Sequence, residues 1–199
     1  MVYQVTEEER KEMEQQILAT QPPGVSSPFS ADIRIAIQIH SSPRLIFRDW
    51  PTDSFVTLCR NILQEFPVRL FLTGGPGDIK KAEEVLTALE RVGLKNRVIH
   101  TAGKLTLRQT AALLEQCALF ITTDTGLMHL GFALSVPTLA ILHPYNAHRV
   151  GPYGYGNLHQ SLVMAGPERE ADGRLRSLSC LLPETVLTRV RKIYSEIIA

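Results

Sequence analysis

The residues with the clearest potential for chemistry lie at 123–130 (TDTGLMHL), directly after an apolar run over 119–122. The run predicts a strand, and the segment after it predicts the start of a helix. The Asp124 carboxylate could cap that helix by accepting hydrogen bonds from its first free amides. Gly126 is a poor helix former in a first turn, which makes sense if a ligand approaches the backbone closely. Free amides and the helix dipole favour an anion at this end.

Two more side chains of this segment could reach the same anion. Thr125 offers a hydroxyl and His129 an imidazole donor, so a diphosphate is a suitable ligand. The alternative is a capped core helix with His129 packed or solvated, because Asp caps are common. Spacing alone leaves both interpretations open.

A glycine-rich turn at 74–78 (GGPGD) follows the apolar run 68–72. It lacks GxGxxG spacing, so it is a poor dinucleotide-binding fingerprint. Asp78 could accept hydrogen bonds from ribose hydroxyls, or it could cap the helix that follows, which is the more common role.

The segment 40–51 follows another apolar run, 33–39, and combines hydroxyls with arginines. A guanidinium can bond two phosphate oxygens with its planar fork. The alternative is a polar loop with solvated arginines, and Trp50 is expected to be a packing anchor. The candidate phosphate contacts here are Ser41, Ser42, Arg44 and Arg48.

Two later segments give weaker signals. Lys104 precedes Thr106 and Gln109, which have capping-box spacing, and its ammonium either faces the ligand or is solvated. The stretch 144–157 (PYNAHRVGPYGYGN) follows the apolar run 138–142 and could form a flexible lid on the same side.

Composition excludes several other classes of protein. Charged residues make up 21% and the net charge is +1, which argues against nucleic-acid binding by bulk electrostatics. The three cysteines, Cys59, Cys117 and Cys180, show no CxxC spacing, so we expect a reducing compartment and no zinc. GxSxG, HExxH and DxD are absent, so a nucleophile elbow and a metal site are not indicated. No signal peptide or 18-residue apolar run is present.

The elements that must position these residues alternate between strands and helices. Expected strands are 33–39, 68–73, 97–100, 119–122, 138–142 and 161–164, and expected helices are 6–19, 53–65, 79–92, 106–116, 125–134 and 183–197. This order predicts a Rossmann-like, doubly wound α/β domain with a parallel sheet, whose ligand lies beyond the carboxyl ends of the strands. We expect an N-terminal helix and linker over 1–30, the binding domain over 31–199, and a surface loop at about 165–182.

Taken together, these turns resemble the C-terminal domain of glycosyltransferase family 9, the lipopolysaccharide heptosyltransferases. The resemblance covers about 33–198, and its most specific part is the Asp-Thr-Gly-x-x-His element at 124–129. Its other parts are Trp50-Pro51, 74–78, GKLTL at 103–107, Ala133-Leu134, Pro137, and Cys180 before Pro183-Glu184.

The resemblance implies one half of a two-domain GT-B enzyme that binds a nucleotide sugar, typically ADP-heptose. It implies that the residues in contact with the phosphates are Thr125, Gly126, Leu127, His129, Arg48, Ser41 and Ser42. Asp124 is assigned to sugar hydroxyls, because its carboxylate repels phosphate, and Asp78 to the nucleoside. Lys104 completes the predicted nucleotide-sugar site.

In the family, a separate N-terminal domain supplies the acceptor site and the catalytic base. Here about 32 residues precede the first strand, so we expect the isolated chain to be inactive, with no catalytic base of its own. The implied reaction is an inverting transfer to a lipid-linked saccharide at the cytoplasmic membrane face, without metal or cofactor. Two alternatives are a non-catalytic nucleotide-sugar module and a dinucleotide-dependent oxidoreductase, the latter disfavoured by the missing GxGxxG.

Overall fold

The strands of this chain form a single twisted sheet in a computed structural model that describes residues 4–19, 33–40, 46–152 and 158–198. In this part of the chain the sheet has six parallel strands in the order β3-β2-β1-β4-β5-β6. That order is typical of dinucleotide-binding Rossmann folds and confirms the predicted doubly wound α/β class. The strands are β1 Ile33–Gln38, β2 Val68–Thr73, β3 Val98–His100, β4 Leu119–Thr123, β5 Thr138–Leu142 and β6 His159–Val163.

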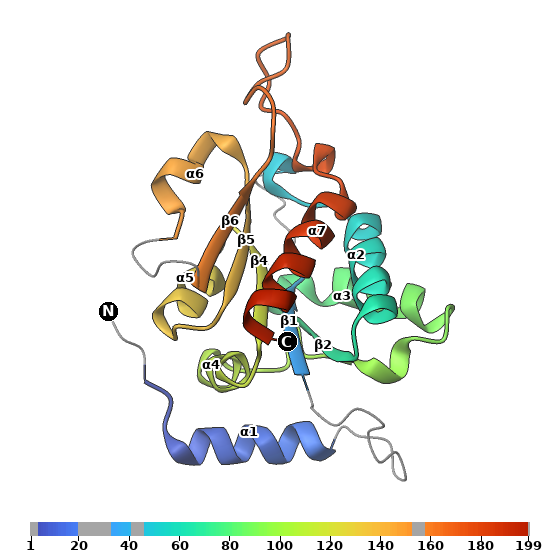
Figure 1. Ribbon diagram of the computed structural model, residues 1–199, viewed down its shortest axis with the longest axis vertical. Helices are drawn as coiled ribbons and strands as arrows, with labels where there is room; N and C mark the ends of the chain where they lie inside the picture. The colour runs from blue at the N-terminus through green and yellow to red at the C-terminus, as the bar shows by residue number, and fades with distance from the viewer. Residues whose placement is uncertain (1–3, 20–32, 41–45, 153–157, 199) are drawn as a thin grey trace.

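Helices cover both faces of this sheet (Figure 1). Ile35 and Ile37 of β1 pack against α2, α3 and α7, whereas Ala36 between them points to the face covered by α4 and α1. This alternation follows from the two-residue period of a strand, and burial on both faces explains the continuous apolar runs. The helices are α1 Glu7–Ala19, α2 Thr52–Glu65, α3 Ile79–Glu90, α4 Leu107–Glu115, α5 Gly126–Ala133, α6 Pro144–Val150 and α7 Pro183–Ile193.

Most of the predicted elements are present, with ends shifted by one or two residues, or by four for the helix predicted over 183–197, because α7 ends at Ile193 and the π-helix η6 Tyr194–Ile198 follows it. The exception is the stretch 144–157, which we predicted as a loop. Residues 144–150 instead form α6, because Pro144 suits a first helical turn and the His143 side chain caps it, accepting a hydrogen bond from the Tyr145 amide at 3.1 Å. Residues 153–157 lie outside the described part of the chain, as does the predicted linker.

The predicted surface loop at 165–182 is largely irregular, as expected, with an isolated bridge and the short helix η5 Leu178–Cys180. It returns to the core at Leu178 and Leu181. There the fully buried Trp50 donates its indole N–H to the Leu181 carbonyl at 2.9 Å, which confirms Trp50 as a packing anchor. Among the described helices, none has the length and apolar content needed to cross a membrane.

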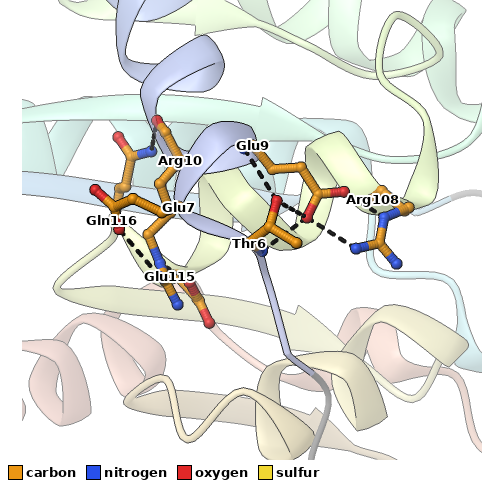
Figure 2. Close-up of polar contacts among 7 residues, drawn as sticks. All are labelled: Thr6, Glu7, Glu9, Arg10, Arg108, Glu115 and Gln116. Atoms are coloured by element: carbon orange, nitrogen blue, oxygen red, sulfur yellow. Dashed lines mark hydrogen bonds and ion pairs between the residues drawn. The ribbon is translucent and has the colours of Figure 1, made fainter.

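The charged helix α1 lies against α4 and begins with a capping box (Figures 1 and 2). The Thr6 amide donates to the Glu9 carboxylate at 2.8 Å, and the Glu9 amide donates to the Thr6 hydroxyl at 3.3 Å. Met13 and Ile17 of α1 are buried against α4, whereas Leu18 is exposed. Polar contacts therefore make up much of the attachment of α1 to the domain.

Candidate functional site

A cavity of about 490 Å³ opens at the carboxyl ends of the central strands. It lies where the strand order reverses between β1 and β4, the position at which doubly wound sheets bind ligands. Turns after four different strands line it in the described part of the chain: Gln38, His40, Gly74, Gly75, Asp78, Leu105, Leu107, Thr110, Thr125, Gly126 and Leu127. The sequence-predicted residues Asp78, Thr125, Gly126 and Leu127 are thus brought together.

The amino end of α5 faces this cavity. Thr125 is the N-cap residue, with extended backbone and no side-chain hydrogen bond to the first turn. Gly126 is exposed, and a Cβ atom built on it would meet nothing within 4 Å. The first-turn amides therefore lack a side-chain cap and lie beneath open space, a suitable position for an anion.

The expectation that Asp124 caps this helix is wrong. The carboxylate of Asp124 forms an ion pair with Arg48 instead, and the Arg48 guanidinium also donates to the Asp124 carbonyl at 3.0 Å. Both side chains are largely buried, with 22% of Arg48 and 9% of Asp124 exposed. Two predicted residues separated by 76 positions thus meet, and the pair joins the segment after β1 to the segment after β4.

Gln38 was missed by the sequence analysis. It is the last residue of β1 and is buried, and its carboxamide oxygen accepts hydrogen bonds from the hydroxyls of Thr122 at 2.5 Å and Thr125 at 2.6 Å. One sequence signal could have found it, namely an amide side chain at the carboxyl end of a central strand that is apolar from Ile35 to Ile37. Gln38 joins the ends of β1 and β4 beneath the cavity.

The Asp78 side chain stabilises the turn in which it lies. Its carboxylate accepts a hydrogen bond from the Gly75 amide at 2.8 Å and lies 3.5 Å from the imidazole of His40, so it does not cap α3 with its side chain. A Cβ atom on Gly74 would come within 2.7 Å of the same carboxylate, which explains glycine there. Asp78 is only 5% exposed, and it contributes a negative charge to the cavity wall.

Lys81 of α3 fastens the loop that carries Arg48. Its ammonium donates to the His40 carbonyl at 2.9 Å, the Trp50 carbonyl at 2.6 Å and the Asp49 carboxylate at 2.5 Å. Lys81 thus holds both ends of the segment 40–50. Sequence reasoning did not select it, because a lysine on an amphipathic helix ordinarily points to solvent.

The remaining predicted residues lie elsewhere. His129 is exposed on α5, its ring edge-on to Phe132 at 6.1 Å between centroids, and is not part of the cavity lining. Ser41, Ser42 and Arg44 lie outside the described residues. In the described chain, no three His, Cys, Asp or Glu side chains lie close enough to hold a metal ion.

Lys104 lines a second cavity, of about 260 Å³, between α1 and the sheet. His100 lines the same space, and burial, together with the charge of Lys104, lowers the pKa of His100 below its ordinary value. Lys104 therefore lies beside the candidate nucleotide site rather than among the residues that line it.

Comparison with known proteins identifies relatives of this chain. The sequence matches the family model for glycosyltransferase family 9 (heptosyltransferase) over residues 2–176. It is 25% identical over 153 residues to lipooligosaccharide heptosyltransferase 2 of Haemophilus influenzae, and 28% identical over 155 residues to lipopolysaccharide heptosyltransferase 2 of Salmonella typhimurium. Each alignment covers 74% of this chain and 43% of the relative, so the chain matches less than half the length of these proteins.

The fold is also shared with a solved structure, that of E. coli ADP-heptose lps heptosyltransferase II. The TM-score is 0.76 at 23% identity, and the match covers 100% of this chain and 54% of the E. coli chain. The likeness places the fold with one half of a GT-B glycosyltransferase, as predicted. The family match spans most of the chain, and we conclude that this chain belongs to glycosyltransferase family 9.

Proposed function

We propose that the cavity binds the nucleoside diphosphate of a nucleotide sugar, with ADP-heptose as the first candidate. The observation that carries this proposal is the amino end of α5, which is uncapped by side chains and lies under open space at Gly126. A diphosphate suits this position because unpaired amides and the helix dipole both stabilise negative charge. Family membership and the ADP-heptose heptosyltransferase from E. coli support the choice of donor.

Within this proposal, residues 31–199 form the donor-binding domain and most predicted residues keep their roles. The phosphates lie at the start of α5, near Thr125, Gly126 and Leu127. Asp78 is close enough to the cavity to contact the nucleoside. Because Arg48 and Asp124 are paired with each other, they act as one unit that faces the sugar and its phosphate. Ser41, Ser42, His129 and Lys104 are proposed as outer contacts.

The reaction proposed for the whole enzyme is an inverting sugar transfer in lipopolysaccharide core synthesis. A base outside this domain takes the proton of an acceptor hydroxyl on a lipid-linked saccharide, at the cytoplasmic face of the inner membrane. The hydroxyl oxygen attacks the anomeric carbon, and the nucleoside diphosphate leaves with the bonding electrons. This chain would stabilise the departing charge through preorganised donors, each of which contributes about 3 kcal/mol in comparable sites.

A glycine substitution tests the binding proposal. Gly126→Val adds a branched side chain at the amino end of α5, where a Cβ atom meets nothing within 4 Å. We expect ADP affinity in calorimetry to fall at least about tenfold, the loss of one charge-assisted hydrogen bond. Gly77→Ala is the matched control, since its Cβ also meets nothing within 4 Å and Gly77 is not in the cavity lining.

Equal ADP affinity in the Gly126→Val variant and the wild type would overturn the proposed site. UDP, GDP and NAD are titrated in parallel, because preference for UDP or GDP would replace ADP-heptose as the donor, and preference for NAD would favour an oxidoreductase. A non-catalytic nucleotide-sugar module is the alternative function. It predicts nucleotide binding without sugar transfer when a family 9 N-terminal domain is supplied.

A further inference from the structure

The Gln38 side chain has two polar atoms, and only its oxygen forms hydrogen bonds within the described part of the chain. Its carboxamide oxygen accepts from the hydroxyls of Thr122 and Thr125 at 2.5 and 2.6 Å. Such distances are normal for O–H···O bonds and short for N–H···O bonds, so the oxygen, not the nitrogen, faces the two threonines. The Thr122 hydroxyl also lies 2.9 Å from the Thr123 carbonyl, so its one proton is shared between two acceptors, whereas Thr125 donates to Gln38 alone. Within the described part of the chain, no hydrogen bond is made by the Gln38 amide nitrogen.

This arrangement also uses the hydroxyl proton of Thr125. A threonine hydroxyl has one proton to donate, and that of Thr125 is directed to Gln38. The Thr125 side chain therefore offers the cavity lone pairs rather than a donor. The donor that replaces it is the planar NH2 of Gln38, held in orientation by the two hydrogen bonds to its oxygen.

The lack of cationic side chains among the described lining residues makes this donor important. None of these described residues is lysine or arginine, and Asp78 is an acid. Arg48 is paired with Asp124, and Lys81 donates to the carbonyls of His40 and Trp50. Among the described residues that line the cavity, the donors available to an anion therefore include neutral N–H groups, from the backbone and from Gln38.

We propose that the Gln38 side-chain NH2 donates a hydrogen bond to the diphosphate of the ligand, and that Thr122 and Thr125 hold it in position. This inference rests on the proposed function, since it assumes a nucleoside diphosphate. The diphosphate is the expected partner, rather than the base or sugar, because Gln38 ends β1 at the switch point and lies 2.6 Å from the N-cap residue of α5.

The decisive variant is Gln38→Glu in the full 199-residue chain. A glutamate still accepts from both threonines, so a purely structural role of Gln38 would survive, whereas the donor is lost. We expect the affinity for ADP to fall about 10- to 100-fold, the range for a hydrogen bond to a charged group, and the affinity for adenosine to change less than threefold. Gln38→Met, which is neutral, should also weaken ADP by about tenfold.

Controls separate the donor from the added charge and from misfolding. Leu107→Glu places a carboxylate at the same cavity without removing a donor, so it should weaken ADP less than Gln38→Glu does. Thermal unfolding and near-ultraviolet circular dichroism establish that each variant is folded. Thr125→Val should add little to Gln38→Met, because residues that act through one hydrogen bond are not additive.

The outcomes distinguish this inference from the proposed function. If wild-type protein binds ADP and folded Gln38→Met binds it equally well, the role of Gln38 is refuted and the nucleotide site stands. An equal loss of adenosine and ADP affinity would place the donor at the nucleoside and overturn the diphosphate assignment. If the wild-type chain binds none of ADP, UDP and GDP, the proposed function fails, and this inference fails with it.

Discussion

Charged residues have different structural roles in two regions of this molecule. Along α1 they attach one helix to the rest of the domain: Glu9 pairs with Arg108, Arg10 with Glu115 at 2.7 Å, and Glu14 with Arg34 at 2.7 Å (Figure 2 shows the first two pairs). At the carboxyl edge of the sheet, Arg48 pairs with Asp124 and Lys81 with Asp49 beside the cavity.

The two regions differ in the groups that remain available to a ligand once the ion pairs have formed. The partners along α1 lie mostly at the surface, where ion pairs contribute little individually. At the carboxyl edge the pairs are more buried and fix the loops around the cavity, while the cavity wall keeps neutral donors for a ligand. Ion pairs of the first kind should affect the attachment of α1, and those of the second kind should affect ligand binding.

The largest expected effect comes from Arg48→Met. It removes the cation beside the buried carboxylate of Asp124, so we expect the free energy of unfolding to fall by about 2 kcal/mol and the affinity for ADP to fall about 100-fold. Denaturant unfolding and calorimetry measure the two effects. Arg48→Met with Asp124→Asn should regain stability without regaining affinity. If Arg48→Met bound ADP with wild-type affinity, the ion pairs at the carboxyl edge would matter for ligand binding no more than those along α1.

Lys81→Met should have the next largest effect. Three hydrogen bonds to the loop 40–50 are lost, so we expect a decrease of about 2 kcal/mol in the free energy of unfolding and about tenfold weaker ADP binding. The neighbouring Lys80 is exposed, and Lys80→Met is the matched control for loss of a lysine on α3. Lys81→Met with an unchanged ADP affinity would show that the loop does not need this anchor to present the site.

A substitution in α1 should affect stability and spare binding. Glu14→Ala removes the bidentate partner of the buried Arg34, so we expect a loss of about 1–2 kcal/mol and faster amide exchange in α1. ADP affinity should stay within twofold. Glu12→Ala, at an exposed position of the same helix, is the control. A parallel loss of ADP affinity would mean that α1 belongs functionally to the site.

The smallest expected effect is a loss of stability of α1 at low pH. Hydrogen bonding from Arg108 lowers the pKa of Glu9 to about 2, and bonding from Arg34 lowers the pKa of Glu14. A carboxyl group whose pKa is depressed in the folded state stabilises that state above its unfolded pKa, and this contribution disappears as pH falls through the folded pKa. Amide protection in α1, measured relative to intrinsic exchange at the same pH, should therefore fall between about pH 4.5 and 2, before the β1–β4 core opens. Simultaneous opening of both would contradict this order.

Much of the fold was predictable because its signals are local. Buried strands reveal themselves as apolar runs, and the capping boxes at Thr6–Glu9 and Thr106–Gln109 mark helix starts that the structure confirms. The α6 helix was missed because its signals conflict. Pro144 can begin a helix, whereas the glycines and tyrosines after Val150 are typical of loops.

The position of the candidate site was determined by the sequence, since parallel strands place the turns after them at one edge and Gly126 marks close backbone access. The partners within that site were decided by tertiary structure. Arg48 binds Asp124 across 76 residues, Gln38 binds Thr125 across 87, and Lys81 holds a loop that precedes it by more than 30. A buried polar group bonds to whichever partner the packing brings within about 3 Å, and local sequence does not contain that distance.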